Sequence, residues 1–530
     1  MFPYQGASAN ASPTVSLERG DYRMRAPPRR PPPLLLFQEP AAAAVPVSRS
    51  QRHNASRNIT LLLLLLAAGT LSCFGAAYYL FATRWAPQTE SPDSIETNAN
   101  YQANATAFID ISPDEKFLSY LPHSGFHNQR IAFENALVLA FALRRTLLVP
   151  PFRLANKPIR YVEFDTLVRH HELSSKVGLQ HCPQVPSYLS RPLECLQYFE
   201  SSHLPWSWLV DLSVPAAHLP LIQLPTSSQR WLHDHLYLNE SDIHALKDRS
   251  PYQFRFLDTN TDSSPKRDRY AQDVYLFNLI AVKARLLQLG TLFGTARLRL
   301  KDPINLAYQH TVRQSMIFTN QNLSQVVDSI AVALSDYFLA VHIRIGDGSF
   351  KADAEQTVKS IWWSLLQDVL GFSPAETCHL QGKFSGLGNL NCSMEFTCTD
   401  CSPLTTVSTI PFPVLGVPCR SPLHREGPYE LLNTPLYVAT DLRHPESDNA
   451  LHLLRRTFPC IFFLADFPRH IQQLESLRSP YDGVRLEPFL LPFIDAMVAA
   501  KALAFVGTQG STFSKFVTTL WHVYHGPNPN

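Results

Sequence analysis

The sequence predicts an α/β fold with parallel sheets, and three features of the chain support this class. Apolar runs of strand length alternate with stretches of helical length from Lys116 onward. Parallel strands need helical crossovers, so this alternation favours parallel sheets over hairpins. Turn-forming residues end several runs, as Pro150 follows Val149 and Gly346 follows Ile345. Finally, 45% of the 530 residues are apolar, enough for more than one hydrophobic core.

The first folded segment has the pattern of a βαβ unit, with a strand at 117–121, a largely apolar helix at 131–145 and a strand at 146–149. The second half repeats the pattern. Its predicted strands are 338–345, 436–440, 461–464 and 504–506, and its predicted helices are 362–370, 447–458, 492–503 and 512–524. We expect two domains, 116–335 and 336–530, with a cysteine-rich insertion at about 372–430.

The region before residue 116 differs in character. Residues 1–58 are rich in proline without apolar periodicity, and we interpret them as a disordered cytosolic tail. Residues 59–82 carry no charge, and as a helix of about 36 Å they would cross a hydrocarbon layer of about 30 Å. The run is too long and too far from the N-terminus for a cleaved signal peptide, and a buried core helix is the weaker alternative. It predicts a transmembrane signal anchor.

The flanking charges predict the orientation of this anchor. Arg49, Arg52 and Arg57 lie on its N-terminal side, so the positive-inside rule keeps the tail in the cytosol. Residues 83–115, rich in Asn, Thr, Ser and Pro, form an expected stem. The folded part would then face the lumen of the endoplasmic reticulum or Golgi as a single-pass type II protein.

Cysteines and sequons agree with a lumenal location. Eight of the nine cysteines follow the apolar run, and in an oxidising compartment we expect them to form disulfides. Asn-x-Ser/Thr sequons begin at Asn104, Asn239, Asn322 and Asn391. The 46 basic residues nearly balance the 44 acidic ones, and no long basic run occurs in the lumenal part. Nucleic acid is therefore not an expected partner.

Two patterns raise the alternative of a metal site. Cys398 and Cys401 form a Cys-x-x-Cys pair, and His233 and His235 would share one face of a strand. Neither pattern is accompanied by the further ligands that zinc needs. Asp-x-Asp, a common metal- and nucleotide-binding motif, does not occur in the chain. We expect no metal and no other cofactor.

The predicted strand 338–345 carries the strongest candidate for ligand binding. Alternate residues of a strand share a face, so His342 and Arg344 project together, opposite their apolar neighbours. The strand ends in Gly346-Asp347-Gly348, and open α/β sheets bind ligands at this carboxyl edge. A guanidinium there can hold phosphate oxygens with a planar fork. The alternative is a structural arginine paired with Asp347.

This strand also carries a family resemblance. His-Ile-Arg-Ile-Gly-Asp at 342–347 resembles the His-x-Arg-x-Gly-Asp motif of protein O-fucosyltransferases and α-1,6-fucosyltransferases. Three further blocks match the family in order. They are Gly-Phe-His-Asn-Gln at 125–129 with Leu-Leu-Val-Pro-Pro at 147–151, Tyr-Val-Ala-Thr-Asp at 437–441, and Pro-Phe-Ile-Asp at 492–495 with Phe-Val-Gly-Thr at 505–508 and Ser-Thr-Phe-Ser at 511–514. The resemblance spans about 116–517.

The resemblance implies a GT-B architecture, in which two Rossmann-like domains face a cleft. It implies a metal-independent, inverting transfer of fucose from GDP-fucose to a hydroxyl, with Ser or Thr of a protein as the expected acceptor. Arg344 and Asn128 would be catalytic. The donor-binding set would be Gly125, Phe126, His127, His342, Arg344, Asp495, Ser511, Thr512 and Phe513. Two rivals remain: an α-1,6-type glycan fucosyltransferase, and an inactive lumenal binding protein with the same fold.

Several of these residues have a simpler alternative role. Asn128 would face the donor phosphates and the acceptor hydroxyl, or would only cap a helix. Ser511 and Thr512 would cradle a phosphate at a helix N-terminus, or would likewise cap it. Asp495 would accept hydrogen bonds from guanine, or would be a solvated helical residue.

The chain also departs from the family pattern. Ile345 stands where the family often has a second arginine, and Thr512 replaces one of a serine pair. We assign no general base among His123, His127 and Glu134.

Overall fold

The computed structural model describes residues 63, 65–74, 112, 114–186, 188–259, 269–346, 348–385 and 415–526. The chain divides into two units, of which one contains residues 100–530 and the other residues 19–99. In the smaller unit, residues 65–74 are helical and exposed. No helix within the described residues combines the length and apolar character needed to cross a membrane, and most of the predicted anchor 59–82 lies outside them.

The first half contains a parallel five-stranded sheet, as the βαβ pattern predicts. Its order is β5-β2-β1-β9-β6, and every neighbouring pair is parallel. The strands are β1 (Phe117–Ser119), β2 (Thr146–Val149), β5 (Leu221–Gln223), β6 (Ile243–Leu246) and β9 (Leu286–Leu289). Every residue of β1, β2 and β9 is buried. Burial on both faces explains why these strands are nearly continuous apolar runs.

Two smaller sheets accompany it. β3 (Phe152–Ala155) pairs antiparallel with β4 (Ser201–Leu204). A parallel sheet of order β10-β7-β8 consists of β7 (Phe254–Leu257), β8 (Gln272–Tyr275) and β10 (Leu298–Arg299). The helices of this half are α3 (Phe126–Leu143), α4 (Phe164–Ser174), α5 (Ser213–Ala216), α6 (Gln229–Leu236), α7 (Leu276–Ile280), α8 (Pro303–Ser315) and α9 (Gln321–Ala333).

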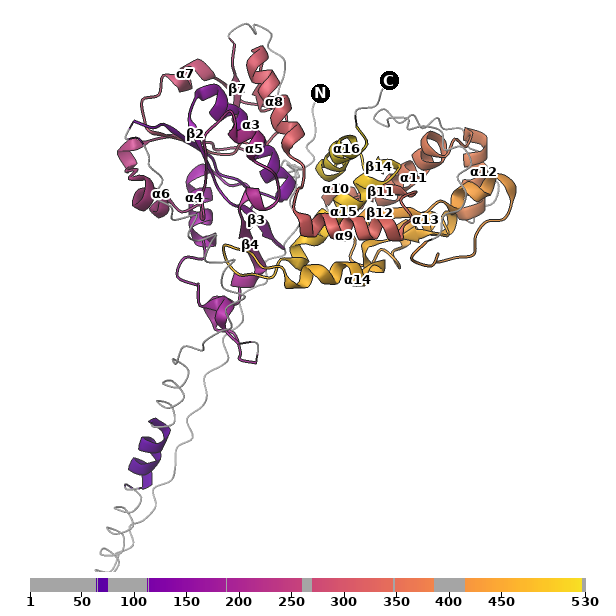
Figure 1. Ribbon diagram of the computed structural model, residues 1–530, viewed down its shortest axis with the longest axis horizontal. Coiled ribbons are helices and arrows are strands. Elements are labelled where there is room, and N and C mark those ends of the chain that lie inside the picture. The colour runs from indigo at the N-terminus through magenta and orange to yellow at the C-terminus, as the bar shows by residue number, and fades with distance from the viewer. Residues whose placement is uncertain are drawn as a thin grey trace, which may run out of the picture. The chain divides into compact units, whose positions relative to one another are not determined.

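Helix α3 connects β1 to β2 and packs against α8 (Figure 1). It begins at Phe126, five residues before the predicted start at 131. The difference arises because the first turn is polar, with His127, Asn128 and Gln129 before the apolar pattern begins. Residues 126–129 of the first family block therefore lie within the helix.

The second half contains a parallel four-stranded sheet of order β13-β12-β11-β14. Its strands are β11 (Leu339–Ile343), β12 (Leu436–Thr440), β13 (Ile461–Phe462) and β14 (Ala504–Gly507). The alternation predicted for β11 is confirmed: Leu339, Val341 and Ile343 belong to one core cluster, and Ala340 belongs to another on the opposite face. The strand ends at Ile343, two residues earlier than predicted, because residues 344 and 345 already belong to the loop at the sheet edge.

The helices of this half are α10 (Gly348–Ala352), α11 (Ala354–Ser364), α12 (Pro374–Ser385), α13 (His452–Thr457), α14 (Pro468–Ile471), α15 (Glu487–Lys501) and α16 (Thr512–His525). A π-helical turn, Leu365–Val369, continues α11, so the helix predicted at 362–370 begins eight residues earlier. α15 begins before Pro492 and contains it. The sequence favoured a start at this residue because proline is disfavoured inside helices.

The disulfide prediction is confirmed within the described residues. Cys182 pairs with Cys195, Cys419 pairs with Cys460, and Cys378 is also disulfide-bonded. The predicted insertion at 372–430 is partly regular, since α12 lies within it, and residues 386–414 lie outside the described part. α9, which precedes the predicted domain boundary, packs against α15 of the second half. The boundary itself stays a prediction.

Candidate functional site

The loop after β11 is fixed by the ends of both neighbouring strands. Thr508, which follows β14, donates from its backbone N–H and its hydroxyl to the carbonyl of His342, and its Oγ1 accepts the backbone N–H of Arg344 at 2.9 Å. Asp441, which follows β12, accepts the N–H groups of Ile345 and Gly346 at 2.9–3.0 Å. These bonds hold the backbone at the carboxyl edge in one conformation.

Gly346 is required by this arrangement. A Cβ at this position would lie 2.9 Å from the Asp441 carboxylate. A larger residue would displace the carboxylate that organises the loop.

The guanidinium of Arg344 lies over the ring of Phe350, with its carbon 4.6 Å from the ring centroid. Phe350 belongs to α10, which begins directly after the glycine turn. A cation–π contact of this kind helps to orient the guanidinium. The alternative, a pair with Asp347, lies outside the described residues.

His342 is buried and links β11 to the start of α16. Its ring stacks on Phe513 at 4.3 Å, and its Nδ1 is hydrogen-bonded to the hydroxyl of Ser514 at 2.7 Å. Burial, with the nearby charge of Arg344, lowers the pKa of His342 to about 3. The imidazole is therefore neutral at physiological pH and adds no charge to the site. Its ring contact and hydrogen bond hold the start of α16 in place.

The first turn of α16 carries the third family block. Ser511 is the N-cap, and its hydroxyl oxygen accepts the N–H of Ser514 at 3.3 Å. The capping role considered for Ser511 is therefore present, and Thr512 is the first helical residue. The exposed N–H groups of such a turn favour an anion.

Helix α3 supplies a second N-terminus. Gly125 is its N-cap without any side-chain capping bond, and Asn128 lies at the third helical position. The alternative in which Asn128 caps the helix is wrong, because Gly125 holds that position. A Cβ at Gly125 would meet no atom within 4 Å, and its φ of −70° suits any residue. Packing within the described chain therefore does not require glycine there.

His127, in the first turn of α3, contacts the N-terminal part of α16. Its ring lies 5.2 Å from Phe513 and 4.8 Å from Phe516, both of α16. Burial, aided by the charges of Arg130 and Arg344, holds the pKa of His127 well below its usual range. Its Nδ1 is buried and has no hydrogen-bond partner among the described residues. The two N-termini thus meet beside Arg344.

A cavity of about 270 Å³ opens at this meeting point. Its lining is mainly aromatic and proline, from both halves of the chain. The lining residues that belong to the predicted site are Gly125, Phe126, His127 and Phe513. The walls otherwise include Phe318, Phe489 and Phe493.

Asp495 is partly buried and hydrogen-bonded. The hydroxyl of Tyr437 donates to its Oδ1 at 2.6 Å across from β12. Burial raises the pKa of Asp495 to about 7, although the Tyr437 bond acts in the opposite direction. The simpler alternative of a solvated helical residue is therefore only partly right, because the carboxyl is partly buried and accepts a hydrogen bond at a fixed position.

His123 and Glu134, two of the residues considered as a general base, are hydrogen-bonded or ion-paired to neighbouring side chains. His123 is hydrogen-bonded through both ring nitrogens, to Ser124 at 2.7 Å and to Thr291 at 2.6 Å, and burial lowers its pKa to about 3. Glu134 forms an ion pair with Arg130 within α3. Both side chains are therefore engaged by neighbours within the first half.

The metal alternatives find no support within the described residues. His233 and His235 lie on helix α6 and not on a strand, so residues two apart point to different sides. His235 stacks on Trp231 at 4.6 Å. His181, Cys182 and Cys195 cluster, but the two sulfurs form a disulfide. Cys398 and Cys401 lie outside the described residues.

Sequence reasoning missed three residues that organise the site. Thr508 and Asp441 stood in the quoted motifs without a role, and Ser514 was likewise unassigned. Each is a short polar residue at the end of a parallel strand or the start of a helix, and that position was the available signal.

Fold and site together define an α/β protein with a candidate site at the carboxyl edge of a parallel sheet. No family model matches the chain. A segment of 37 residues is 60% identical to O-fucosyltransferase 30 of Arabidopsis thaliana, and it covers 7% of each chain.

The chain is also similar to solved fucosyltransferase structures. One is POFUT1 in complex with GDP-fucose, at 13% identity and a TM-score of 0.33, covering 78% of this chain and 95% of that one. Another is NodZ α-1,6-fucosyltransferase soaked with GDP-fucose, at 12% identity and a TM-score of 0.33, covering 77% and 92%.

Proposed function

We propose that this chain is a fucosyltransferase that transfers fucose from GDP-fucose to a hydroxyl, with inversion and without a metal. The observation that carries the proposal is the meeting of two helix N-termini, those of α3 and α16, beside Arg344 at the carboxyl end of β11. Helix N-termini and a guanidinium together suit a diphosphate. The 37-residue match to O-fucosyltransferase 30 supports the same chemistry.

In the proposed reaction the bond between C1 of fucose and the β-phosphate oxygen breaks as the acceptor oxygen bonds to C1 from the opposite face. The acceptor proton leaves to a base that we do not assign. Negative charge develops on GDP, and Arg344 with the N–H groups of α16 would stabilise it. Asn128 would reach the phosphates and the acceptor, and Asp495 would accept hydrogen bonds from guanine.

We further propose a protein Ser or Thr as acceptor, with a glycan hydroxyl as the alternative. The uncharged run 59–82 supports the proposed lumenal placement. Residues 65–74 of this run are helical with exposed leucines, which suits a lipid-facing helix. Full-length protein should stay in membranes through carbonate extraction, and its release would contradict the anchor.

The donor test uses purified full-length protein in detergent. GDP and GDP-fucose should raise its melting temperature, whereas UDP should not. Hydrolysis of GDP-fucose should persist in EDTA. Stabilisation by GDP without any hydrolysis or transfer would favour the inactive binding protein, and no response to GDP would overturn the proposal.

A further inference from the structure

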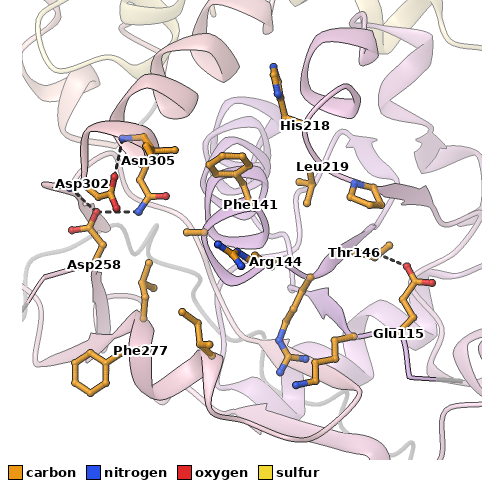
Figure 2. A pocket seen from close by; sticks show the side chains of 17 residues that line it. Glu115, Phe141, Arg144, Thr146, His218, Leu219, Asp258, Phe277, Asp302 and Asn305 are labelled. Atoms are coloured by element: carbon orange, nitrogen blue, oxygen red, sulfur yellow. Dashed lines mark hydrogen bonds between the residues drawn. The ribbon is translucent and has the colours of Figure 1, made fainter. Parts of the chain in front are cut away.

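A second cavity, of about 640 Å³, lies at the amino ends of strands β1 and β2 in the first sheet (Figure 2). Glu115 and Lys116 precede β1, and Thr146 opens β2. The candidate site instead follows the carboxyl ends of strands. The cavity is therefore separate from the proposed chemistry.

Part of its lining is exposed apolar surface. Phe277 and Ile280 of α7 and Ile304 of α8 are 51%, 53% and 67% exposed. Large apolar side chains gathered at a hollow indicate an interaction site more strongly than scattered ones do. The described chain leaves this surface uncovered.

The cavity is lined by three basic side chains, Lys116, Arg144 and Arg145, and by three acidic ones, Glu115, Asp258 and Asp302. The three acids and Arg145 are hydrogen-bonded within the described residues. Arg144 caps α3 in the left-handed conformation and lies near the centre of the cavity in Figure 2. Neither Arg144 nor Lys116 has an ion pair with a described residue. Asp258, in contrast, accepts the N–H groups of Lys301 and Asp302 at 2.9 and 3.0 Å. An occupant with apolar side chains and one acidic group would complement this lining.

The chain itself supplies such a segment at the rim. The N–H of Glu115 donates to the carbonyl of Ser112 at 3.0 Å, so the chain reverses direction there. The four residues before Ser112 are Phe-Ile-Asp-Ile, at 108–111. Fully extended, four residues reach about 14 Å, so they can enter the cavity from its rim.

We propose that residues 108–111 dock into this cavity. Phe108, Ile109 and Ile111 cover the apolar side chains of α7 and α8, and the Asp110 carboxylate pairs with Arg144. Docking would fix the end of the predicted stem to the folded part. The inference is independent of the proposed transferase activity.

A charge-reversal cycle tests the pairing in full-length protein in detergent, read by amide hydrogen exchange of residues 141–146 and 276–280. Asp110→Arg and Arg144→Asp should each speed exchange about 2- to 5-fold, as expected for loss of an exposed ion pair. The double variant should return to the wild-type rate. Aspartate tolerates the left-handed conformation at position 144, so the fold should be kept. Asp114→Arg, at an exposed acid outside the cavity, is the control.

Disulfide trapping gives an independent measurement. Ile109→Cys combined with Ile280→Cys should form a cross-link under mild oxidation. Ile109→Cys combined with Val332→Cys, at an exposed position on α9, should not. The proposal would be overturned if the single variants left exchange unchanged, or if their effects were additive in the double variant. Equal cross-linking of both cysteine pairs would also overturn it.

Discussion

Arg344 is positioned by two contacts, one from Thr508 to its backbone and one from the ring of Phe350 to its guanidinium. Arg344→Ala should lower turnover by about 10²–10³, the usual effect of removing one preorganised donor. Arg344→Lys should restore little, because a point charge cannot make a two-pronged contact. Fucose transfer or donor hydrolysis measures the effect.

The control for Arg344 is Arg230→Ala, since Arg230 lies exposed on α6. The control should keep full activity. Near-normal activity of a folded Arg344→Ala protein would show that the arginine is structural and would remove it from the site.

Asp495 gives a prediction with a definite pH sign. Its folded-state pKa of about 7 lies above the ordinary aspartate value, so the native state holds this proton between about pH 4 and pH 7 while the unfolded state has lost it. Stability from this group therefore falls as pH rises through that window. Asp495→Asn removes this titration. The stability of the variant minus that of wild type should therefore be larger at pH 8 than at pH 5.

Melting temperatures at the two pH values measure this difference. Asp165→Asn, at an exposed site, should show no such change. A difference between Asp495→Asn and wild type that is equal at both pH values would contradict the assigned pKa shift.

At the scale of elements, the segment before α15 docks onto the first half through Asp482. Its carboxylate accepts Lys176 Nζ at 2.6 Å and Ser202 Oγ at 3.0 Å, and both charged side chains are nearly inaccessible. The carbonyl of Asp482 also accepts the hydroxyl of Tyr198 at 2.8 Å. This network ties α4 and β4 to the second half.

Asp482→Ala should lower the free energy of unfolding by about 3–5 kcal/mol, because it leaves a buried ammonium unpaired. Asp165→Ala is the matched control, since it breaks an exposed pair with Lys247 and should cost at most about 1 kcal/mol. Denaturant unfolding measures both variants. Similar losses would mean that the buried network contributes no more than a surface pair.

The first residues of the helices show which boundaries the sequence patterns predict and which they miss. Strand β2 and helix α16 match their predictions closely because apolar periodicity and a serine cap define them. Helices α3, α11 and α15 begin five to eight residues early, because their first turns are polar or contain proline. These helices are longer than the apolar pattern of the sequence alone predicts.

At the scale of the whole molecule, several histidines are buried in the neutral form. Burial lowers the pKa of His123 and His342 to about 3 and that of His171 to about 4. The unfolded state takes up these protons below about pH 6.5 and the native state does not, so stability should fall as pH drops from 7 to 5. Burial also raises the pKa values of Asp495, Glu134 and Asp248, and these three groups oppose the trend.

The melting temperature between pH 7 and pH 5 measures the slope. His171→Gln should reduce the slope, since glutamine can still donate to the carbonyl of Pro122 that His171 contacts at 2.8 Å. His233→Gln, at an exposed site, should leave it unchanged. A slope that is the same in all three proteins would contradict the role of His171.

The sequence by itself determined the parallel α/β class, the disulfides, and the position of Arg344 at a strand's carboxyl end. These follow from local patterns: apolar runs, cysteine content and a turn after a strand. Only the tertiary structure decided that His127 meets Phe513, that Asp495 is held by Tyr437, and that Thr508 and Asp441 fix the loop. Each of these pairs joins residues far apart in the chain, and their contacts depend on strand order and helix packing, which local sequence patterns do not encode.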